Sequence, residues 1–205
     1  MACKSGFDQK LPQEISLQSL KLSDLDIVYV FVLGDQGTGK TTLIDSIITR
    51  HVCDPLLPSF QYVRESDRMT DKGMVTLRLL ELNREQLSLP EISQVCRAAK
   101  HVFLFVYACD DLPSFNFLYM RWILNVRKAF GRTVTTFMLL NKIDLKTDAY
   151  FKKNYPNYSD VLSHTYKKIF NVDYAFECSA LTGHQVVFAF CEIAKLGNET
   201  RPLLI

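Results

Sequence analysis

Short apolar runs alternate with amphipathic stretches along most of the chain. Ile27–Leu33 and Val102–Tyr107 are nearly continuous apolar runs, which are typical of strands buried on both faces of a sheet. After the first run, Leu43, Ile44 and Ile47 recur at helical spacing and predict an amphipathic helix. The repeated alternation of strand and helix predicts an α/β fold, in which a mostly parallel sheet carries helices on both faces.

The same patterns place the other elements. His51–Lys72 has little periodicity and is predicted to be a long loop with a short strand at Phe60–Val63. Met74–Leu82 begins with alternating apolar and polar residues, and a hairpin around Lys72–Gly73 would make one edge of an expected six-stranded sheet antiparallel. The further predicted strands are Thr135–Leu140 and Tyr174–Cys178, and the further predicted helices cover Glu91–Lys100, Phe115–Val126, Ser159–Phe170 and Val187–Ala194. The second of these helices has an apolar stripe that includes Trp122 and is expected to pack in the core, and Gly131 is expected to stop this helix.

Length and composition fit one globular domain. The chain has 205 residues, of which 48% are hydrophobic and 22% are charged. We expect the domain at residues 27–197, an N-terminal extension at 1–26 and a short tail at 198–205. The net charge of +2 gives no reason to expect nucleic acid as a partner. The 6 cysteines lack C-x-x-C spacing, so we expect reduced thiols in a cytoplasmic protein rather than disulfides or a zinc site.

The sequence carries no signal for a membrane. Its apolar runs are far shorter than the ~20 residues that span a bilayer, and the N-terminus lacks the apolar core of a signal peptide. Ala2 excludes the usual myristoylation start, and the C-terminal Arg-Pro-Leu-Leu-Ile has no prenylation motif. We therefore expect a cytoplasmic protein, whose contact with the cytosolic face of an organelle membrane would need acylation of Cys3 or a partner.

A glycine-rich loop follows the first apolar run. Gly34-Asp35-Gln36-Gly37-Thr38-Gly39-Lys40-Thr41 fits the phosphate-loop pattern G-x-x-x-x-G-K-[ST] without mismatch. The glycines let backbone N–H groups converge on an anion, Lys40 offers a charge to the terminal phosphates, and the Thr41 hydroxyl can ligate Mg²⁺. The alternative is a turn that matches by chance. Because a predicted strand precedes the loop and a predicted helix follows it, we favour a nucleoside-phosphate site.

Two further motifs lie where later strands end. Asn141-Lys142-Ile143-Asp144 follows one strand, and Glu177-Cys178-Ser179-Ala180 follows another. The Asp144 carboxylate can accept hydrogen bonds from N1–H and the exocyclic amine of guanine, which adenine does not offer. Asn141 can tie its loop to the phosphate loop, the Lys142 stem can cover the base, and a backbone N–H of the last motif can meet the guanine carbonyl. The motifs predict one guanine-nucleotide site at the carboxyl edge of the sheet.

The motifs GDQGTGKT, NKID and ECSA carry a resemblance to small GTPases of the Ras superfamily over about Ile27–Lys195. The stretches EISQ, VYACDD, SF and RWI are most similar to the Rho and Miro branches. This resemblance implies a P-loop small-GTPase fold, GTP or GDP with Mg²⁺, and effector and regulator proteins that bind switch regions at 51–72 and 83–100. The nucleotide-binding residues that it implies are Asp35, Gln36, Gly37, Thr38, Gly39, Lys40, Thr41, Thr42, Asn141, Lys142, Asp144, Ser179 and Ala180.

The chain departs from the family pattern at residues 81–86, at the end of the predicted strand Met74–Leu82. Where the family has D-x-x-G and then a catalytic Gln, this chain has Glu81, Arg84 and Glu85 at the Asp, Gly and Gln positions. Glu81 can reach Mg²⁺ through water, whereas the bulk of Arg84 obstructs a backbone contact with the γ-phosphate. Either Gln86 orients the water through a one-residue shift, or that function is absent. We favour absence, because this catalysis depends on positioning; with Lys40, the residues Gln86 and Glu85 are the catalytic candidates.

Two other residues bear on the γ-phosphate. Ser59, by its spacing from Lys40, is the candidate for the hydroxyl that the family's first switch gives to Mg²⁺, and a solvated loop serine is the alternative. Gln36 stands where Ras and Rho have glycine, and its side chain can hinder the transition-state geometry. We therefore expect a molecular switch that binds guanine nucleotide and hydrolyses GTP slowly.

Two other functions stay open. The first is a binding-only pseudo-GTPase, in which the nucleotide is a structural ligand of a scaffold or interaction protein. The second is an ATP-dependent kinase or ATPase, which Asp144 disfavours because its carboxylate would meet the adenine edge with the wrong polarity.

Overall fold

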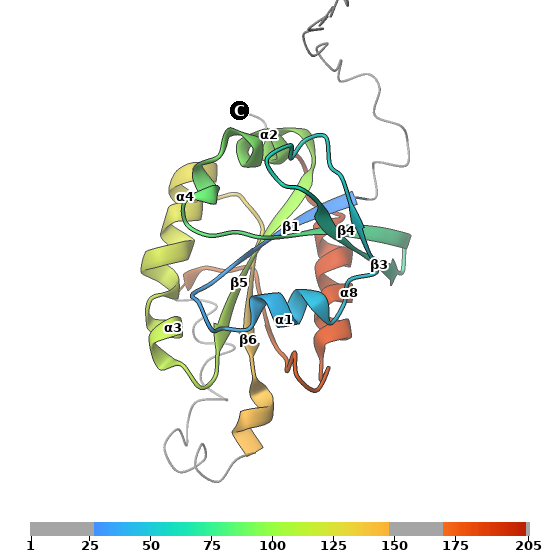
Figure 1. Ribbon diagram of the computed structural model, residues 1–205. Helices are drawn as coiled ribbons and strands as arrows, with labels where there is room; N and C mark the ends of the chain where they lie inside the picture. The colour runs from blue at the N-terminus through green and yellow to red at the C-terminus, as the bar shows by residue number, and fades with distance from the viewer. Residues whose placement is uncertain (1–26, 148–169, 204–205) are drawn as a thin grey trace, which may run out of the picture.

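A seven-stranded sheet forms the centre of the fold, with helices on both faces (Figure 1). The computed structural model describes residues 27–147 and 170–203. The strands are β1 (Ile27–Leu33), β2 (Arg50–Val52), β3 (Val63–Thr70), β4 (Gly73–Glu81), β5 (Lys100–Ala108), β6 (Thr136–Asn141) and β7 (Tyr174–Glu177). The helices are α1 (Lys40–Asp45), η3 (Gln86–Ser88), α2 (Pro90–Ala98), α3 (Leu112–Asn116), η4 (Leu118–Ile123), α4 (Leu124–Phe130), η5 (Ile143–Thr147) and α8 (Val186–Gly197). Within the described residues, no helix is both long and apolar enough to cross a bilayer.

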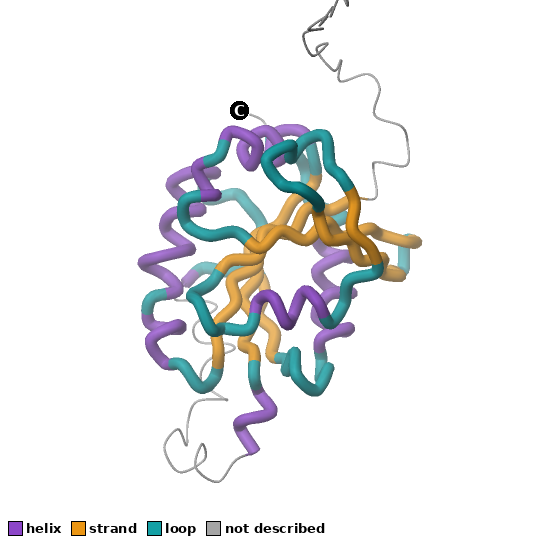
Figure 2. Tube along the Cα trace, viewed as in Figure 1, coloured by secondary structure: helices purple, strands orange, loops and turns teal. Residues whose placement is uncertain are grey.

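The strands run in the order β2-β3-β4-β1-β5-β6-β7. From β4 to β7 all neighbours are parallel, whereas β2 and β3 are antiparallel additions at one edge. The tube in Figure 2 shows the strands as a twisted layer between the helices. Because the parallel strands end at the same edge, the loops that follow β1, β4, β6 and β7 lie close together there.

The central strand β1 has a core on each of its faces. Val28 and Val30 pack in a cluster with residues of α1 and α8. Tyr29 and Phe31 point the other way and pack with residues of α2, α3, η4 and α4. Burying each large apolar side chain contributes about 1.5–3 kcal/mol, and this double burial explains why the first apolar run has no polar alternation.

The predicted α/β fold is confirmed, but the sheet has one strand more than the six predicted. The added strand is β2, and the strand predicted at Phe60–Val63 is instead β3 at Val63–Thr70. Arg50 and His51 of β2 are exposed, so this three-residue strand has no apolar pattern by which the sequence would reveal it. The predicted long loop shrinks to residues 53–62. The predicted hairpin exists, with Thr70 and Gly73 paired across its turn.

Two predicted helices differ from the structure. The first helix ends at Asp45, one turn earlier than its apolar spacing indicates, although Ile47 is still buried. The helix predicted at Phe115–Val126 is divided into α3, a π-helical turn η4 and α4, although it stops at Gly131, which has φ of 86°, as predicted. The predicted helix at Ser159–Phe170, apart from its last residue, and the N-terminal extension lie outside the described residues.

Candidate functional site

The phosphate loop joins β1 to α1 and packs against the ends of β5 and β6. A Cβ on Gly34 would collide with the backbone oxygen of Val106 in β5. A Cβ on Gly39, whose φ is 85°, would lie 2.5 Å from Asn141 Nδ2. Glycine is therefore required at both positions, because the loop backbone has to approach its neighbours this closely.

Lys40 lies inside the curve of the phosphate loop. Its Nζ donates to the backbone oxygens of Gly34 and Asp35, both at 3.0 Å, and lies 3.7 Å from Glu81 Oε1. Burial lowers the pKa of the Lys40 ammonium, and the nearby charges of Glu81 and Asp35 oppose this shift. Thr38 is fully buried and donates its hydroxyl to the Asp35 carbonyl at 2.9 Å. The loop thus holds its own lysine in place, with the charge available to an anion.

Two side chains with oxygen atoms that could ligate a metal lie side by side, one in the first turn of α1 and one at the end of β4. The Thr41 hydroxyl donates to Glu81 Oε2 at 2.7 Å, and Arg64 Nη1 approaches the same carboxylate oxygen at 3.8 Å. A hydroxyl and a carboxylate are donors that Mg²⁺ accepts, and this ion commonly keeps several waters and binds substrate phosphates. The residues present therefore fit Mg²⁺, although the described residues contain no cluster of three His, Cys, Asp or Glu side chains that would hold a metal alone.

Asn141 connects the three sequence motifs. Its Nδ2 donates to the backbone oxygen of Thr38 in the phosphate loop at 3.0 Å, and its Oδ1 accepts from the Ala180 N–H at 3.0 Å. The Ser179 hydroxyl donates to the Asp144 carboxylate. The structure thus brings Asn141, Asp144, Ser179 and Ala180 together beside the phosphate loop. A backbone N–H of the last motif was expected to meet the guanine carbonyl, and that of Ala180 is bonded to Asn141 here.

Two buried thiols contact the segment that contains Asn141 and Lys142. Cys109 Sγ donates to the Lys142 carbonyl at 2.8 Å, and Cys178 Sγ lies 3.7 Å from Asn141 Oδ1. Burial raises the pKa of each thiol to about 12. Both groups therefore stay protonated at neutral pH and serve in packing rather than as nucleophiles. Lys142 itself has φ of 64° and donates Nζ to Asp110 Oδ2 at 3.1 Å.

A cavity of about 550 Å³ opens beside the phosphate loop. Its lining combines the loop with the stretch that departs from the family pattern. The lining residues are Gly34, Asp35, Gln36, Lys40, Glu81, Leu82, Asn83, Arg84, Glu85, Gln86 and Trp122. Thr41 and Thr42 are exposed on the first turn of α1. The phosphate-loop residues that line the cavity belong to the phosphate half of the predicted site. Asp144 does not line the cavity and lies in a separate part of the same sheet edge.

The Asp35 carboxylate is held by Trp122, which its apolar stripe predicts only to pack, and by Arg121, for which the sequence predicts no contact. Trp122 Nε1 donates to Asp35 Oδ1 at 2.8 Å, and Arg121 Nη1 donates to Asp35 Oδ2 at 2.9 Å. Both donors lie on η4, and π-helical turns are frequent at functional sites. The apolar stripe placed Trp122 in the core, where 4% of it is exposed, but gave no sign that its indole N–H supports the phosphate loop.

Gln86 and Asn83 close a turn on each other. Gln86 Oε1 accepts from the Asn83 N–H at 2.8 Å, and Asn83 Oδ1 accepts from the Gln86 N–H at 2.9 Å. This reciprocal pair has the pattern of a capping box and closes the turn that leads into η3. The side-chain oxygen of Gln86 is therefore occupied by backbone, while Glu85 is exposed at the turn.

Ser59 is bonded to the first turn of α2. Its hydroxyl and its N–H both donate to Glu91 Oε1, at 2.5 Å and 3.2 Å. Glu91 lies in the first turn of α2, and Ser59 does not line the cavity. The loop 53–62 and α2 are therefore joined in this structure, and the role of Ser59 at a metal stays a prediction.

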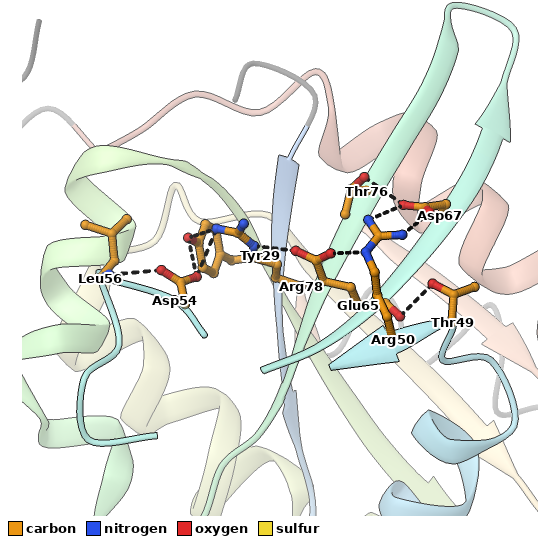
Figure 3. Close-up of polar contacts among 9 residues, drawn as sticks. All are labelled: Tyr29, Thr49, Arg50, Asp54, Leu56, Glu65, Asp67, Thr76 and Arg78. Carbon is orange, nitrogen blue, oxygen red and sulfur yellow. Dashed lines mark hydrogen bonds and ion pairs between the residues drawn. The ribbon is translucent and has the colours of Figure 1, made fainter. Parts of the chain in front are cut away.

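A buried polar network fixes the start of that loop (Figure 3). The Asp54 carboxylate is fully buried and accepts from the Tyr29 hydroxyl at 2.6 Å, from Arg78 Nη1 at 3.0 Å and from the Leu56 N–H at 2.9 Å. Burial, with the bond to Asp54, raises the pKa of the Tyr29 phenol, so that it remains a donor. These bonds attach the loop to β1 and β4.

The same network continues into the antiparallel edge of the sheet. Arg78 Nε donates to Glu65 Oε1 at 2.8 Å, and Arg50 Nε donates to Glu65 Oε2 at 2.7 Å. Arg50 also bonds to Asp67, which accepts from the Thr76 hydroxyl at 2.8 Å. Figure 3 shows these side chains in one line across β2, β3 and β4. The pairing explains how the short β2 is held despite its exposed side chains.

A phosphate loop at the carboxyl edge of a mostly parallel sheet defines a P-loop nucleotide-binding protein of the α/β class. Residues 29–198 match the sequence profile of the Ras family. The chain therefore belongs to the Ras family, and it is a small GTPase of the Ras superfamily as its motifs predicted.

Individual relatives agree with this assignment. The chain is 28% identical over 181 residues to Mitochondrial Rho GTPase 1 of two strains of Cryptococcus neoformans var. neoformans serotype D, with 87% of this chain and 25% of those proteins covered. It is 25% identical over 142 residues to Ras-like protein family member 12 of Bos taurus, with 68% of this chain and 48% of that protein covered. The predicted similarity to the Rho and Miro branches is confirmed, and the chain spans about a quarter of the length of the fungal relatives.

Proposed function

We propose that this chain is a guanine-nucleotide switch that binds GTP and GDP with Mg²⁺ and hydrolyses GTP slowly. The bonds of Asn141 to Thr38 at 3.0 Å and to Ala180 at 3.0 Å carry this proposal. They support one continuous ligand whose phosphates meet Lys40 and whose base meets Asp144. A carboxylate there accepts from guanine and repels the acceptor edge of adenine, so the base would be guanine.

Slow hydrolysis follows from the groups around the cavity. In hydrolysis, water attacks the γ-phosphorus while the bond to the β–γ bridging oxygen breaks, which gives GDP, phosphate and a proton. Lys40 would hold the terminal phosphates, and Thr41 with Glu81 would hold Mg²⁺, which neutralises charge on the phosphate oxygens. The engagement of Gln86 supports slow hydrolysis, because its side-chain oxygen already accepts from the Asn83 N–H at 2.8 Å and is not free to orient the water.

The proposal is tested by loading the purified chain with GTP and following the bound nucleotide by extraction and chromatography. We expect GTP to remain bound for hours with slow conversion to GDP. Complete conversion within minutes would contradict slow hydrolysis, and a chain that binds neither nucleotide would contradict the whole proposal. The engaged Gln86 also supports the alternative, a binding-only pseudo-GTPase, in which bound GTP would never be converted.

We further propose where partners bind. The loop 53–62 and the segment 83–100 lie next to each other, because Ser59 bonds to Glu91. A surface made of both segments would change when the nucleotide changes, so effectors and regulators would bind there. Since the fungal relatives are named as mitochondrial, we propose that such a partner brings the chain to the cytosolic face of an organelle membrane.

Replacing Thr41 with alanine should remove the effect of Mg²⁺ on nucleotide release. The Thr41 hydroxyl lies 2.7 Å from Glu81 Oε2 and would be the protein's direct ligand to the ion. In the unchanged chain we expect removal of Mg²⁺ by a chelator to speed GDP release by about ten-fold or more. In Thr41→Ala, release should be fast with and without chelator, whereas the exposed Thr133→Ala should behave as the unchanged chain. Equal chelator sensitivity in Thr41→Ala would contradict the assignment.

Replacing Glu91 with alanine should favour GTP over GDP. If Ser59 serves Mg²⁺ when GTP is bound, its two bonds to Glu91 compete with that state. Removing the competitor should raise the affinity for a non-hydrolysable GTP analogue by about three- to ten-fold and leave GDP affinity unchanged. Competition titrations measure both. In a Ser59→Ala background the effect of Glu91→Ala should vanish; a persistent effect would show that Glu91 acts on something other than Ser59.

A further inference from the structure

Arg84 occupies the tip of a turn that faces the phosphate loop. The capping box between Asn83 and Gln86 fixes the backbone on both sides of the tip. Arg84 lines the 550 Å³ cavity together with Lys40 and Gly34. The backbone at Arg84 is therefore held beside the cavity by the fold, before any ligand arrives.

The Arg84 guanidinium is available for a ligand. Arg84 is exposed, and within the described parts of the chain it makes no hydrogen bond and no ion pair. Two other arginines near the site are engaged, Arg64 with Glu81 and Arg121 with Asp35. The second cation of the cavity, Lys40, is already bonded to two backbone oxygens. The cavity therefore combines one fixed cation with one whose donors are unused.

The chemistry of the neighbouring groups indicates what Arg84 binds. The carboxylate of Glu81 is already shared by Thr41, Lys40 and Arg64, so it is not a free partner for Arg84. A guanidinium presents five N–H donors in a planar fork, which matches the oxygens of a terminal phosphate. Arg84 stands where the family has the glycine that gives its N–H to the γ-phosphate.

We infer that Arg84 binds the γ-phosphate through its side chain and thereby distinguishes GTP from GDP. This inference rests on the proposed function, and it gives Arg84 a role in recognition that does not require rapid hydrolysis. The side chain would supply a charged donor in place of the backbone contact that its bulk is expected to obstruct. The switch could then respond to the γ-phosphate even with slow hydrolysis.

The test compares affinities for guanosine β,γ-imidotriphosphate and for GDP, both with Mg²⁺, by titration of the full chain. We expect Arg84→Ala to weaken the triphosphate analogue by about ten-fold or more while GDP changes by less than about two-fold, because a hydrogen bond to a charged group is lost only with the triphosphate. Arg84→Lys keeps the charge and loses the fork, so its loss should be intermediate. Arg132→Ala changes an exposed arginine that does not line the cavity and should change neither affinity.

The outcomes separate this inference from the proposed function. If the unchanged chain binds GDP and Arg84→Ala weakens only the triphosphate analogue, both stand. If GDP binds but Arg84→Ala changes the two affinities equally or not at all, the inference is wrong and the proposed function stands. If the unchanged chain binds neither nucleotide, the proposed function fails first. Thermal melting of Arg84→Ala should match the unchanged chain, since the side chain is exposed and unpaired within the described structure.

Discussion

Replacing Asp144 with asparagine should lower the affinity for GDP by about 100-fold or more and raise the affinity for xanthosine diphosphate. An amide cannot accept both hydrogen bonds that guanine's N1–H and exocyclic amine donate. It can donate to the carbonyl that xanthine has in place of the amine. The Ser179 hydroxyl, which donates to the Asp144 carboxylate, can still donate to the amide oxygen, so the loop should keep its form.

Competition titration with the two diphosphates measures this exchange of specificity. Asp71→Asn is the matched control, because Asp71 is exposed on the β3–β4 turn, where its carboxylate lies 3.8 Å from Lys195 Nζ at the surface. The control should bind GDP as the unchanged chain does. An Asp144→Asn chain that still prefers GDP would show that Asp144 does not read the base.

Replacing Asp54 with alanine should destabilise the fold by about 3–5 kcal/mol and lower the melting midpoint by roughly 6–20 °C. The substitution removes one of the two carboxylates that pair with Arg78, leaving it with Glu65, and removes the acceptor of the buried Tyr29 hydroxyl. It also frees the Leu56 N–H. Because these bonds attach the loop 53–62 to the sheet, amide hydrogen exchange in that loop should increase more than in β5.

Denaturant unfolding and hydrogen exchange measure the two effects. Asp71→Ala should change stability by less than about 0.5 kcal/mol, since an exposed ion pair contributes little. A loss in Asp54→Ala no larger than in this control would contradict the role of the network. An equal rise in exchange throughout the chain would show global destabilisation without a specific effect on the loop.

The central strands and motifs were predictable because each has a local signal. A strand covered on both faces requires an apolar run, and β1 and β5 supply it. The phosphate loop requires glycines where its backbone meets Val106 and Asn141, so its pattern is visible in the sequence. The expectation that Asn141 ties two loops together is confirmed by its 3.0 Å bond to Thr38.

The remaining features depend on contacts between distant residues. The short β2 is held by Arg50 and its carboxylate partners on β3, which no periodicity reveals. The bond from Trp122 to Asp35 spans 87 positions, and the bond from Ser59 to Glu91 spans 32. An aromatic residue in an apolar stripe predicts packing, and only the folded chain shows that its one polar atom supports the phosphate loop. The role of Ser59 as a ligand to Mg²⁺ and the roles of Glu85 and Gln86 in hydrolysis stay predictions.

The most direct test of the central claim is a calorimetric titration of the nucleotide-stripped chain with GDP and, separately, with ADP, in the presence of Mg²⁺. We expect GDP to bind at about one per chain with a dissociation constant below about 1 μM, and ADP to bind at least about 1000-fold more weakly, because Asp144 pairs with guanine and repels the adenine edge. Equal affinities, or no binding of GDP, would contradict the account that these motifs form one guanine-nucleotide site.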